Sequence, residues 1–458
     1  MDGLKLRSDH DRAIARLAIP ALGTLVAEPL YVLADTAIVG HLGTSELAGL
    51  ALATTVLLSV YGLLIFLAYG TTASVARLMG AGDVEKAARV SVQALWLAAI
   101  IGLAVAAGLV ATATPLLELL GGSGQALVAG RTYLVISSAG VPFLLLTLAG
   151  AGAFHGRQDT RTPLVIAVSS AVANLVLESI LVFGLDYGIG ASALSTVLAQ
   201  AGAGLVYTNR GLAWARSLGL SLAPVATLLR QLLIAGQPLM LRNLALRGSF
   251  TLATAMAARI GEVELAAHQV GVQIWSTLAL ALDAVAIAGQ ALTGHWLGAG
   301  EAIRAREAAK RMIEIDVAVG VVVGLVILVA RHPIASIFSS DPGVVATVAY
   351  VLVFVAVVEP INGYVFALDG ILIGAGDLRY LGRSMSLAAV IFMIMAALLL
   401  NSETLFGIGP LLQGRSGLGW LWTTLGLFMG LRGLTLWWRW RSDHWIVTGA
   451  EPAPDGVS

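Results

Sequence analysis

The sequence repeats itself at a constant spacing of 218 positions, the distance from Pro20 to Pro238. At this spacing the Gly-Ala-Gly sequence at 80–82 matches the one at 298–300. An offset that holds along most of a chain indicates two homologous halves with almost no insertion between them. We therefore expect the chain to fold into two similar lobes.

The composition indicates that both lobes lie in a membrane. Hydrophobic residues make up 58% of the chain and charged residues 12%, and the mean hydropathy is +0.88. These values are typical of polytopic membrane proteins. The chain has no cysteine, which excludes disulfides and thiolate metal sites.

Twelve stretches are apolar enough to cross a bilayer, which requires ~20 predominantly apolar residues per helix. Six fall in each half, and an even number of spans per repeat gives both halves the same orientation. The predicted fold is an all-α integral membrane protein with twelve transmembrane helices in two pseudo-symmetric six-helix bundles. The predicted spans are 14–39, 50–76, 90–114, 131–154, 163–184, 188–208, 231–258, 266–295, 313–330, 346–373, 384–400 and 417–436.

Basic residues orient the spans, because Lys and Arg accumulate in cytoplasmic loops. Most of them fall on one side, together with both chain ends. Arg77 and Arg432 are counted on that side, whereas Arg242 and Arg247 fall within a span. We expect a multi-pass protein of the inner (plasma) membrane with both termini in the cytoplasm.

The repeat and the spans divide the chain into four parts. We expect an N-lobe of six helices at 1–208, a cytoplasmic linker at 209–230, and a C-lobe of six helices at 231–441. The tail at 442–458 is rich in Pro, Gly and acidic residues, a composition that predicts disorder.

Ionisable groups inside spans are costly unless they face partners or water, so each one is a functional candidate. The first half has Glu28 and Asp35 in its first span and Glu178 in its fifth, with Asn174 four residues earlier on the same helix face. Asp35, Glu178 and Thr196 of the sixth span are expected roughly 6–12 Å below the outer ends of their helices. Side chains at one depth on three helices can form a single pocket.

Two carboxylates in such a pocket can take up a proton or share a cation, because burial and a nearby like charge both disfavour the doubly ionised form. The alternative is a hydrogen-bonded network that fixes helix packing. The matching positions of the second half hold Ala253 in place of Asp35 and Ala396 in place of Glu178. The fold therefore does not require these acids. Their presence in only one half favours a functional role over a structural one.

The second half carries a different set of charged residues within its spans. A buried Arg keeps its proton and needs a carboxylate partner. Depth favours Arg242–Asp283 and Arg247–Glu359 as pairs. Such residues serve either as structural ion pairs or in substrate binding and gating. The set consists of Arg242, Arg247, Asp283, Glu359 and Asp369.

Prolines inside spans, among them Pro29 and Pro360, predict bent helices, because proline removes a helix hydrogen bond. A bend at Pro29, six residues before Asp35, could couple protonation to helix shape. A static kink is the alternative.

Three motifs together resemble the multidrug and toxic compound extrusion (MATE) family, most closely its DinF-type branch. They are Ala-Asp-Thr-Ala-Ile-Val-Gly-His-Leu-Gly at 34–43, Gly-Arg-Gln-Asp-Thr-Arg-Thr-Pro at 156–163, and Asn-x-x-x-Glu at 174–178. The resemblance covers about residues 10–440. It implies twelve helices in two lobes and export of amphipathic, often cationic compounds, driven by a proton or sodium gradient.

The resemblance also implies the position of a coupling-ion site, formed by Asp35, Asn174, Glu178 and Thr196. This sequence departs from the family in having Glu178 where Asp is usual. It also lacks the glutamate that some relatives carry in the seventh span, where Arg242 and Arg247 stand instead. The second departure argues against a sodium site in the C-lobe.

The predicted function is that of a secondary antiporter, not an enzyme. We expect it to export small amphipathic or cationic drugs or metabolites by alternating access, in exchange for protons, with sodium as the less favoured ion. The expected partners are these substrates and the lipid bilayer. We expect a monomer, no nucleic-acid partner and no cofactor apart from the coupling ion.

Two other functions remain open at this point. A lipid-linked precursor flippase of the same superfamily would need several cations to bind phosphates, and only Arg242 and Arg247 are candidates. An intramembrane aspartyl protease is the more remote alternative, because Gly374-Ala375-Gly376-Asp377 fits the GxGD pattern of such enzymes. The same four letters recur at 80–83 beside basic residues, which favours a turn with a solvated aspartate.

Overall fold

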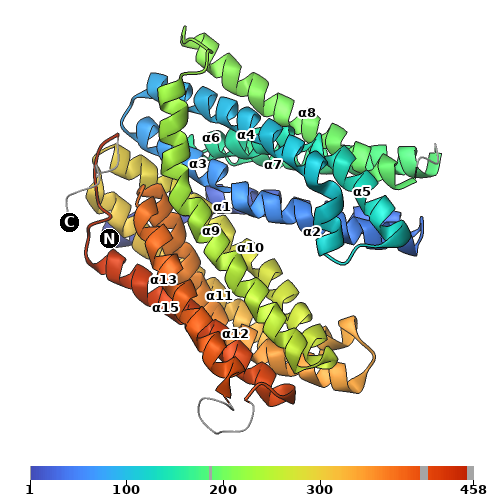
Figure 1. Ribbon diagram of the computed structural model, residues 1–458. Helices are drawn as coiled ribbons and strands as arrows, with labels where there is room; N and C mark the ends of the chain where they lie inside the picture. Colours follow the sequence, from blue (N-terminus) through green and yellow to red (C-terminus); the bar gives the residue numbers. More distant parts are fainter. Residues whose placement is uncertain (1, 185–187, 403–410, 451–458) are drawn as a thin grey trace.

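The structure is a computed structural model that describes residues 2–184, 188–402 and 411–450 (Figure 1). The described residues form long helices joined by short loops. The helices are α1 (Asp2–Gly40), α2 (Thr44–Leu64), α3 (Phe66–Gly80), α4 (Val84–Leu119), α5 (Gly124–Ser138), α6 (Val141–Gly156), α7 (Arg161–Ser179), the π-helical turn η1 (Ile180–Gly184), α8 (Gly188–Ser217), α9 (Ala226–Ile260), α10 (Glu262–Gly298), α11 (Ala302–Phe338), α12 (Pro342–Gly374), α13 (Leu378–Leu400) and α15 (Gly414–Arg441).

The helices account for the predicted spans. Within the described residues, nine segments are long and apolar enough to cross a membrane, or ten if the bent pair α5–α6 counts as one span. The pair α2–α3 already counts as one of the nine. Helices α9 and α15 are also long enough, and they are more polar because they carry several arginines. With these two helices included, the twelve-helix prediction is confirmed.

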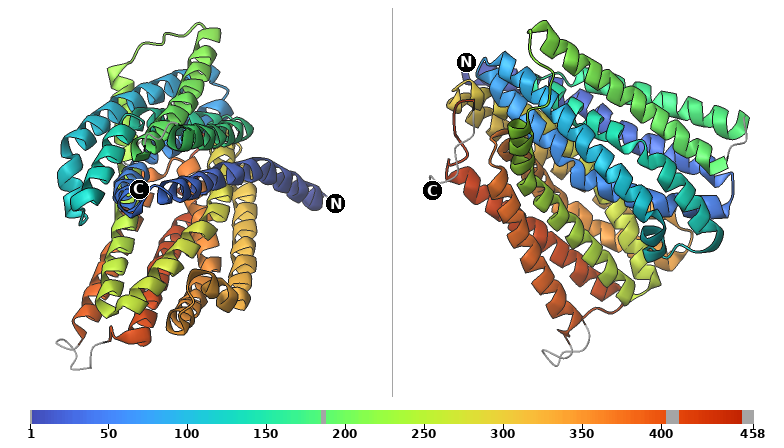
Figure 2. Two further views of the ribbon diagram at one scale, coloured as in Figure 1. Left: turned by 90° about the vertical axis from the view of Figure 1, so that its right-hand side faces the viewer. Right: turned by 45° about the horizontal axis from the view of Figure 1, so that its top comes forward.

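Two groups of helices, α1–α8 and α9–α15, are visible in Figures 1 and 2. They meet near the end of the molecule where both chain termini lie, which we call the termini end, and diverge toward the opposite end (Figure 1). Helices α1 and α3 of the first group pack along α10 of the second. We refer to the two groups as the N-lobe and the C-lobe.

The repeated Gly-Ala-Gly sequences explain how closely the lobes meet. A β-carbon on Gly80 of α3 would lie 1.9 Å from a backbone oxygen of α10, and one on Gly298 of α10 would lie 2.0 Å from a backbone oxygen of α3. After these helices end, Gly82 and Gly300 adopt φ angles of 77° and 80°, a left-handed conformation that glycine tolerates without strain. Each half thus contributes the same glycine to one crossing between the lobes.

The repeat also governs packing inside each lobe. In the N-lobe, Gly102 of α4 faces Pro142 of α6, and a β-carbon on the glycine would lie 2.5 Å from the proline Cα. In the C-lobe, Gly320 of α11 faces Pro360 of α12, with 3.1 Å for the same pair of atoms. Both halves therefore use a glycine to admit a proline-containing helix.

The segment between the lobes is shorter than the expected linker. Helix α8 continues to Ser217 and α9 begins at Ala226, so only 218–225 lie outside helices. Gln93 of α4 holds this segment: its side-chain Nε2 donates to the carbonyl oxygen of Ala223 over 3.0 Å, and its Oε1 accepts from the nitrogen of Val225 over 2.8 Å. The lobe boundaries at 1–208 and 231–441 stay a prediction.

Part of the expected tail is folded against the termini end. Trp445 is buried, and its ring stacks on that of Trp440 with centroids 5.0 Å apart. The expectation of disorder therefore does not hold for 442–450, because a large apolar ring offsets the polar composition of this stretch. The remaining residues, 451–458, lie outside the described part of the chain.

Arg77 connects this segment to both lobes. Its guanidinium donates to the carbonyl oxygens of Ala375 (2.7 Å), Val447 (2.6 Å) and Gly449 (3.0 Å). Arg77 is therefore buried inside the protein, although the sequence places it with the loop arginines. Its position follows from the backbone carbonyls that α12 and the tail present to it.

Replacing Gly298 by Val should open the lobes at the termini end, because its side chain would clash with the backbone of α3. The chain lacks cysteine, so spin labels can be placed at Glu85→Cys and Ile303→Cys without background. We expect a longer and broader distance distribution in G298V. Gly108→Val is the control, since a β-carbon there meets nothing within 4 Å. An unchanged distribution in G298V would contradict the role given to this crossing.

Candidate coupling-ion and substrate site

Asp35 lies at the centre of a buried polar cluster in the N-lobe. It is 5% exposed, on α1. Ser192 of α8 donates from Oγ to its Oδ1, and Tyr133 of α5 donates from its hydroxyl to Oδ2 over 3.3 Å. Asp35 therefore receives two neutral donors and no cation among these contacts.

Glu178 of α7 stands beside Asp35 and is fully buried. Its carboxyl group adjoins that of Asp35. Neither of its oxygens has a hydrogen-bond donor within the described residues. Two adjoining carboxyl groups with no neighbouring cation can be accommodated together when they share a proton or a bound cation. The π-helical turn η1 begins two residues after Glu178, and such turns are frequent at functional sites.

Asn174 and Thr196 form the second half of the cluster. The Nδ2 of Asn174 donates to Oγ1 of Thr196 over 3.0 Å, and both residues are buried. The structure thus brings together Asp35, Asn174, Glu178 and Thr196, as the sequence predicts. Their role in ion coupling stays a prediction.

Sequence reasoning missed two members of the cluster, Tyr133 and Ser192. Ser192 lies one helical turn before Thr196, so the same helix face presents both hydroxyls, and this spacing could have revealed it. Tyr133 lies within α5, and no sequence pattern indicates that it belongs to the cluster.

A cavity of ≈ 200 Å³ lies in the N-lobe next to this cluster, on the side that faces α10 of the C-lobe. Helices α1, α2, α3, α6, α7 and α8 of the N-lobe and α10 of the C-lobe line it. Asn174 and Thr196 belong both to the cavity wall and to the polar cluster. The cavity and the buried carboxyl pair are therefore directly connected.

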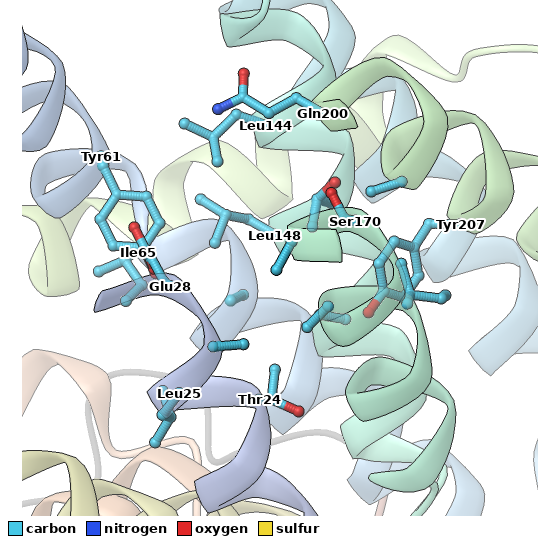
Figure 3. A pocket seen from close by; sticks show the side chains of 18 of the residues that line it. Thr24, Leu25, Glu28, Tyr61, Ile65, Leu144, Leu148, Ser170, Gln200 and Tyr207 are labelled. Atoms are coloured by element: carbon cyan, nitrogen blue, oxygen red, sulfur yellow. The ribbon is translucent and has the colours of Figure 1, made fainter. Parts of the chain in front are cut away.

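The cavity wall combines acids with aromatic rings. Glu28 lies beside Tyr61 and Ile65 (Figure 3), and Tyr31, Tyr69 and Asp283 also line the cavity. No Lys or Arg is among the described residues that line it. Carboxylates and aromatic faces both attract organic cations. This wall suits a positively charged amphipathic molecule.

The charged residues of the C-lobe pair differently from the prediction. Asp369 of α12 accepts from Arg242 of α9 over 2.5 Å and from Arg432 of α15 over 2.6 Å, both at Oδ2. The predicted pair Arg242–Asp283 is therefore wrong as a direct contact, because α9 and α15 both direct a guanidinium at α12. Arg432 is 4% exposed. It is therefore a buried residue, whereas the sequence analysis counts it among the loop arginines.

Arg247 and Glu359 do not pair with each other either. The guanidinium of Arg247 lies over Gly62 of α2, where a β-carbon would be 1.7 Å from it. Glu359 instead accepts from Nδ2 of Asn362 on its own helix over 3.3 Å. The prediction from depth fails here because the two side chains face different neighbours.

Asp377 of the GxGD sequence has a basic partner. Its Oδ2 accepts from Nε of Arg439 over 2.5 Å, so its partner is an arginine and not the second carboxylate that an aspartyl protease requires.

Comparisons with known proteins agree with this architecture. The family model described as MatE matches residues 20–180 and 238–399. The chloroplastic Protein DETOXIFICATION 44 of Arabidopsis thaliana is 32% identical, over 96% of this chain and 84% of its own. The DNA damage-inducible protein F of Escherichia coli strain K12 is 30% identical, over 96% of this chain and 95% of its own.

Solved structures show the same fold. The Vibrio cholerae MATE transporter VcmN in its bent form superposes with a TM-score of 0.84 at 21% identity, covering 97% of this chain and 100% of that chain. A MOP superfamily transporter from Pyrococcus furiosus gives a TM-score of 0.84 at 22% identity, covering 96% and 97%.

Asp369→Ala should destabilise the protein, because it leaves two buried guanidinium groups without their shared partner. Breaking such a buried pair costs about 3–5 kcal/mol. Unfolding in detergent, followed by circular dichroism, measures the loss. Arg432→Met is the matched control, since Asp369 keeps Arg242 as a partner. A loss in D369A no larger than in R432M would contradict the shared-partner arrangement.

Proposed function

The chain belongs to the MatE family of multidrug and toxic-compound efflux transporters, and from this premise we propose that it is a proton-coupled antiporter for amphipathic cations. The observation that carries the proposal is the connection of the acidic, aromatic cavity to the buried Asp35–Glu178 pair through Asn174 and Thr196. A cation in the cavity and a proton on the pair would then compete electrostatically.

Competition of this kind gives exchange. When the pair carries a negative charge, that charge favours a cation in the adjoining cavity, and the added proton removes the attraction. Proton uptake therefore releases the substrate, and substrate binding favours proton release. By linkage, the two ligands weaken each other by the same factor.

A proton fits the pair better than sodium does. A hard cation needs several oxygen ligands, but donors from Ser192 and Tyr133 already occupy both oxygens of Asp35. A single proton between the carboxyl groups satisfies Glu178 and displaces neither donor.

The arrangement of the lobes supports alternating access. The positive-inside rule makes the termini end the cytoplasmic one, because most Lys and Arg residues belong to the side that holds both chain ends. The lobes diverge at the opposite end (Figure 1), which is the outer side in this proposed orientation. Bending of α1 at Pro29 and of α12 at Pro360 provides a route to the change in shape. We place the protein as a monomer in the plasma membrane with both termini in the cytoplasm.

The flippase alternative receives no support from the cavity. A lipid-linked precursor carries phosphate groups that bind to Arg and Lys, whereas the described cavity wall has Glu28 and Asp283 and neither of these cations. The substrate class favoured by the charge of this wall is cationic.

Asp35→Asn should abolish export while the protein still folds and inserts, because the variant keeps the side-chain shape but cannot form the anionic pair. The measurement is efflux of a fluorescent organic cation from proteoliposomes, driven by a pH gradient alone or by a sodium gradient alone. Wild-type protein is expected to respond to the pH gradient. Asp341→Asn, which removes an acid at the start of α12, serves as control. Wild-type export by D35N would refute coupling at this pair.

A further inference from the structure

A second group of buried acids lies in the C-lobe, apart from the cluster around Asp35 and from the ion pairs of Asp369. Asp316 of α11 is fully buried, and within the described residues neither of its carboxylate oxygens has a hydrogen-bond partner. Glu359 and Asn362 of α12 are also fully buried. Glu359 Oε2 and Asn362 Oδ1 likewise lack partners within the described chain. All four of these unpartnered atoms are acceptors.

Close helix packing brings the three side chains into one seam. A β-carbon on Gly363 of α12 would lie 2.3 Å from the carbonyl oxygen of Asp316. One on Gly320 of α11 would lie 2.4 Å from the carbonyl oxygen of Glu359. The two helices are therefore in backbone contact at the level of both acids.

The charged groups around Asp316 do not neutralise it. The groups that act on it electrostatically are Asp283 from α10 and Glu359 from α12, and both are acids. Arg242 and Arg432 are bound to Asp369 on α12.

Arg311, the basic residue of α11 that is nearest to Asp316 in sequence, is also engaged elsewhere. Arg311 pairs with Asp11 of α1 and with Glu314. An unpaired buried carboxylate costs several kcal/mol, so such a group binds a proton instead.

The internal repeat shows that the packing does not need these acids. The positions 218 residues earlier hold Ala98 for Asp316 (316 − 218), Val141 for Glu359 and Leu144 for Asn362. The N-lobe packs α4 on α6 through the same glycine–proline contact, with Ala98 and Val141 buried. An apolar seam is therefore sufficient for the fold.

We propose that Asp316, Glu359 and Asn362 form a second proton-binding site in the C-lobe, which takes up one proton per transport cycle in addition to the one at Asp35 and Glu178. The proton converts one carboxylate of the seam into a carboxylic acid and leaves again as the cycle returns. Asp283 provides the route, because it lines the cavity and interacts with Asp316. The inference rests on the proposed antiport and predicts its stoichiometry.

The test is the substrate gradient that a fixed pH gradient can sustain in proteoliposomes, with the membrane potential clamped at zero by potassium and valinomycin. A pH difference of one unit sustains about a tenfold gradient per proton exchanged. Two protons per cation therefore predict about 100-fold for the wild-type protein. Asp316→Ala, which installs the residue found at the matching position 98, should reduce the gradient to about tenfold.

Two further variants distinguish the loss of an acid from misfolding of the protein. Asp316→Asn keeps the side-chain volume and Glu359→Gln removes the second acid, and each should give the same tenfold reduction. Asp341→Asn should sustain the full wild-type gradient. Size-exclusion chromatography and thermal unfolding establish that each variant is folded.

The outcomes separate this inference from the antiport itself. If wild-type protein and D316A sustain the same gradient, the second site is refuted while proton antiport stands. If the wild-type protein sustains none, the antiport fails. If a sodium gradient at constant pH drives export in the wild-type protein but not in D316A, the seam binds sodium, and the proton assignment is overturned.

Discussion

The lack of neutralising cations beside buried acids is the constraint on which the rest of this structure depends. Inside a membrane protein an isolated charge costs several kcal/mol, so each acid acquires a cation or a proton. Asp369 has two arginines and holds three helices together. Glu178 and Asp316 have no such partner within the described residues. The same side-chain type therefore serves as structural support in one place and as a candidate ion carrier in others.

The fold places these acids where a change of charge can act on transport. The lobes touch at the termini end through Gly80 and Gly298, and the cavity lies in the N-lobe against α10 of the C-lobe. Asn174 and Thr196 belong both to the cavity wall and to the cluster around Asp35. In the proposed antiport, a proton at this cluster would change the electrostatic field at a substrate bound in the cavity. Such coupling would need no long-range pathway, because the ion site and the cavity share Asn174 and Thr196.

The sequence predicts the fold well, because the repeat and the apolar spans reflect constraints that any membrane helix obeys. It also predicts the cluster of Asp35 and Glu178, since spacing along helices determines depth. It fails where helix rotation decides the outcome. Depth alone pairs Arg242 with Asp283, but the helix faces direct it to Asp369. The sequence analysis does not identify Asp316 as a site residue, because it lies only three residues inside the predicted span 313–330. An acid so close to the end of a span is easily taken for part of the adjoining loop.

The most direct test of the account is infrared detection of protonated carboxyl groups in the protein reconstituted in lipid. Difference spectra between acid and alkaline samples report carboxylic acids that lose their protons. We expect such a signal in the wild-type protein, reduced in Glu178→Gln and reduced further when Asp35, Glu178, Asp316 and Glu359 are all replaced by their amides. A spectrum without protonated carboxyl groups, in protein that still exports its substrate, would contradict it.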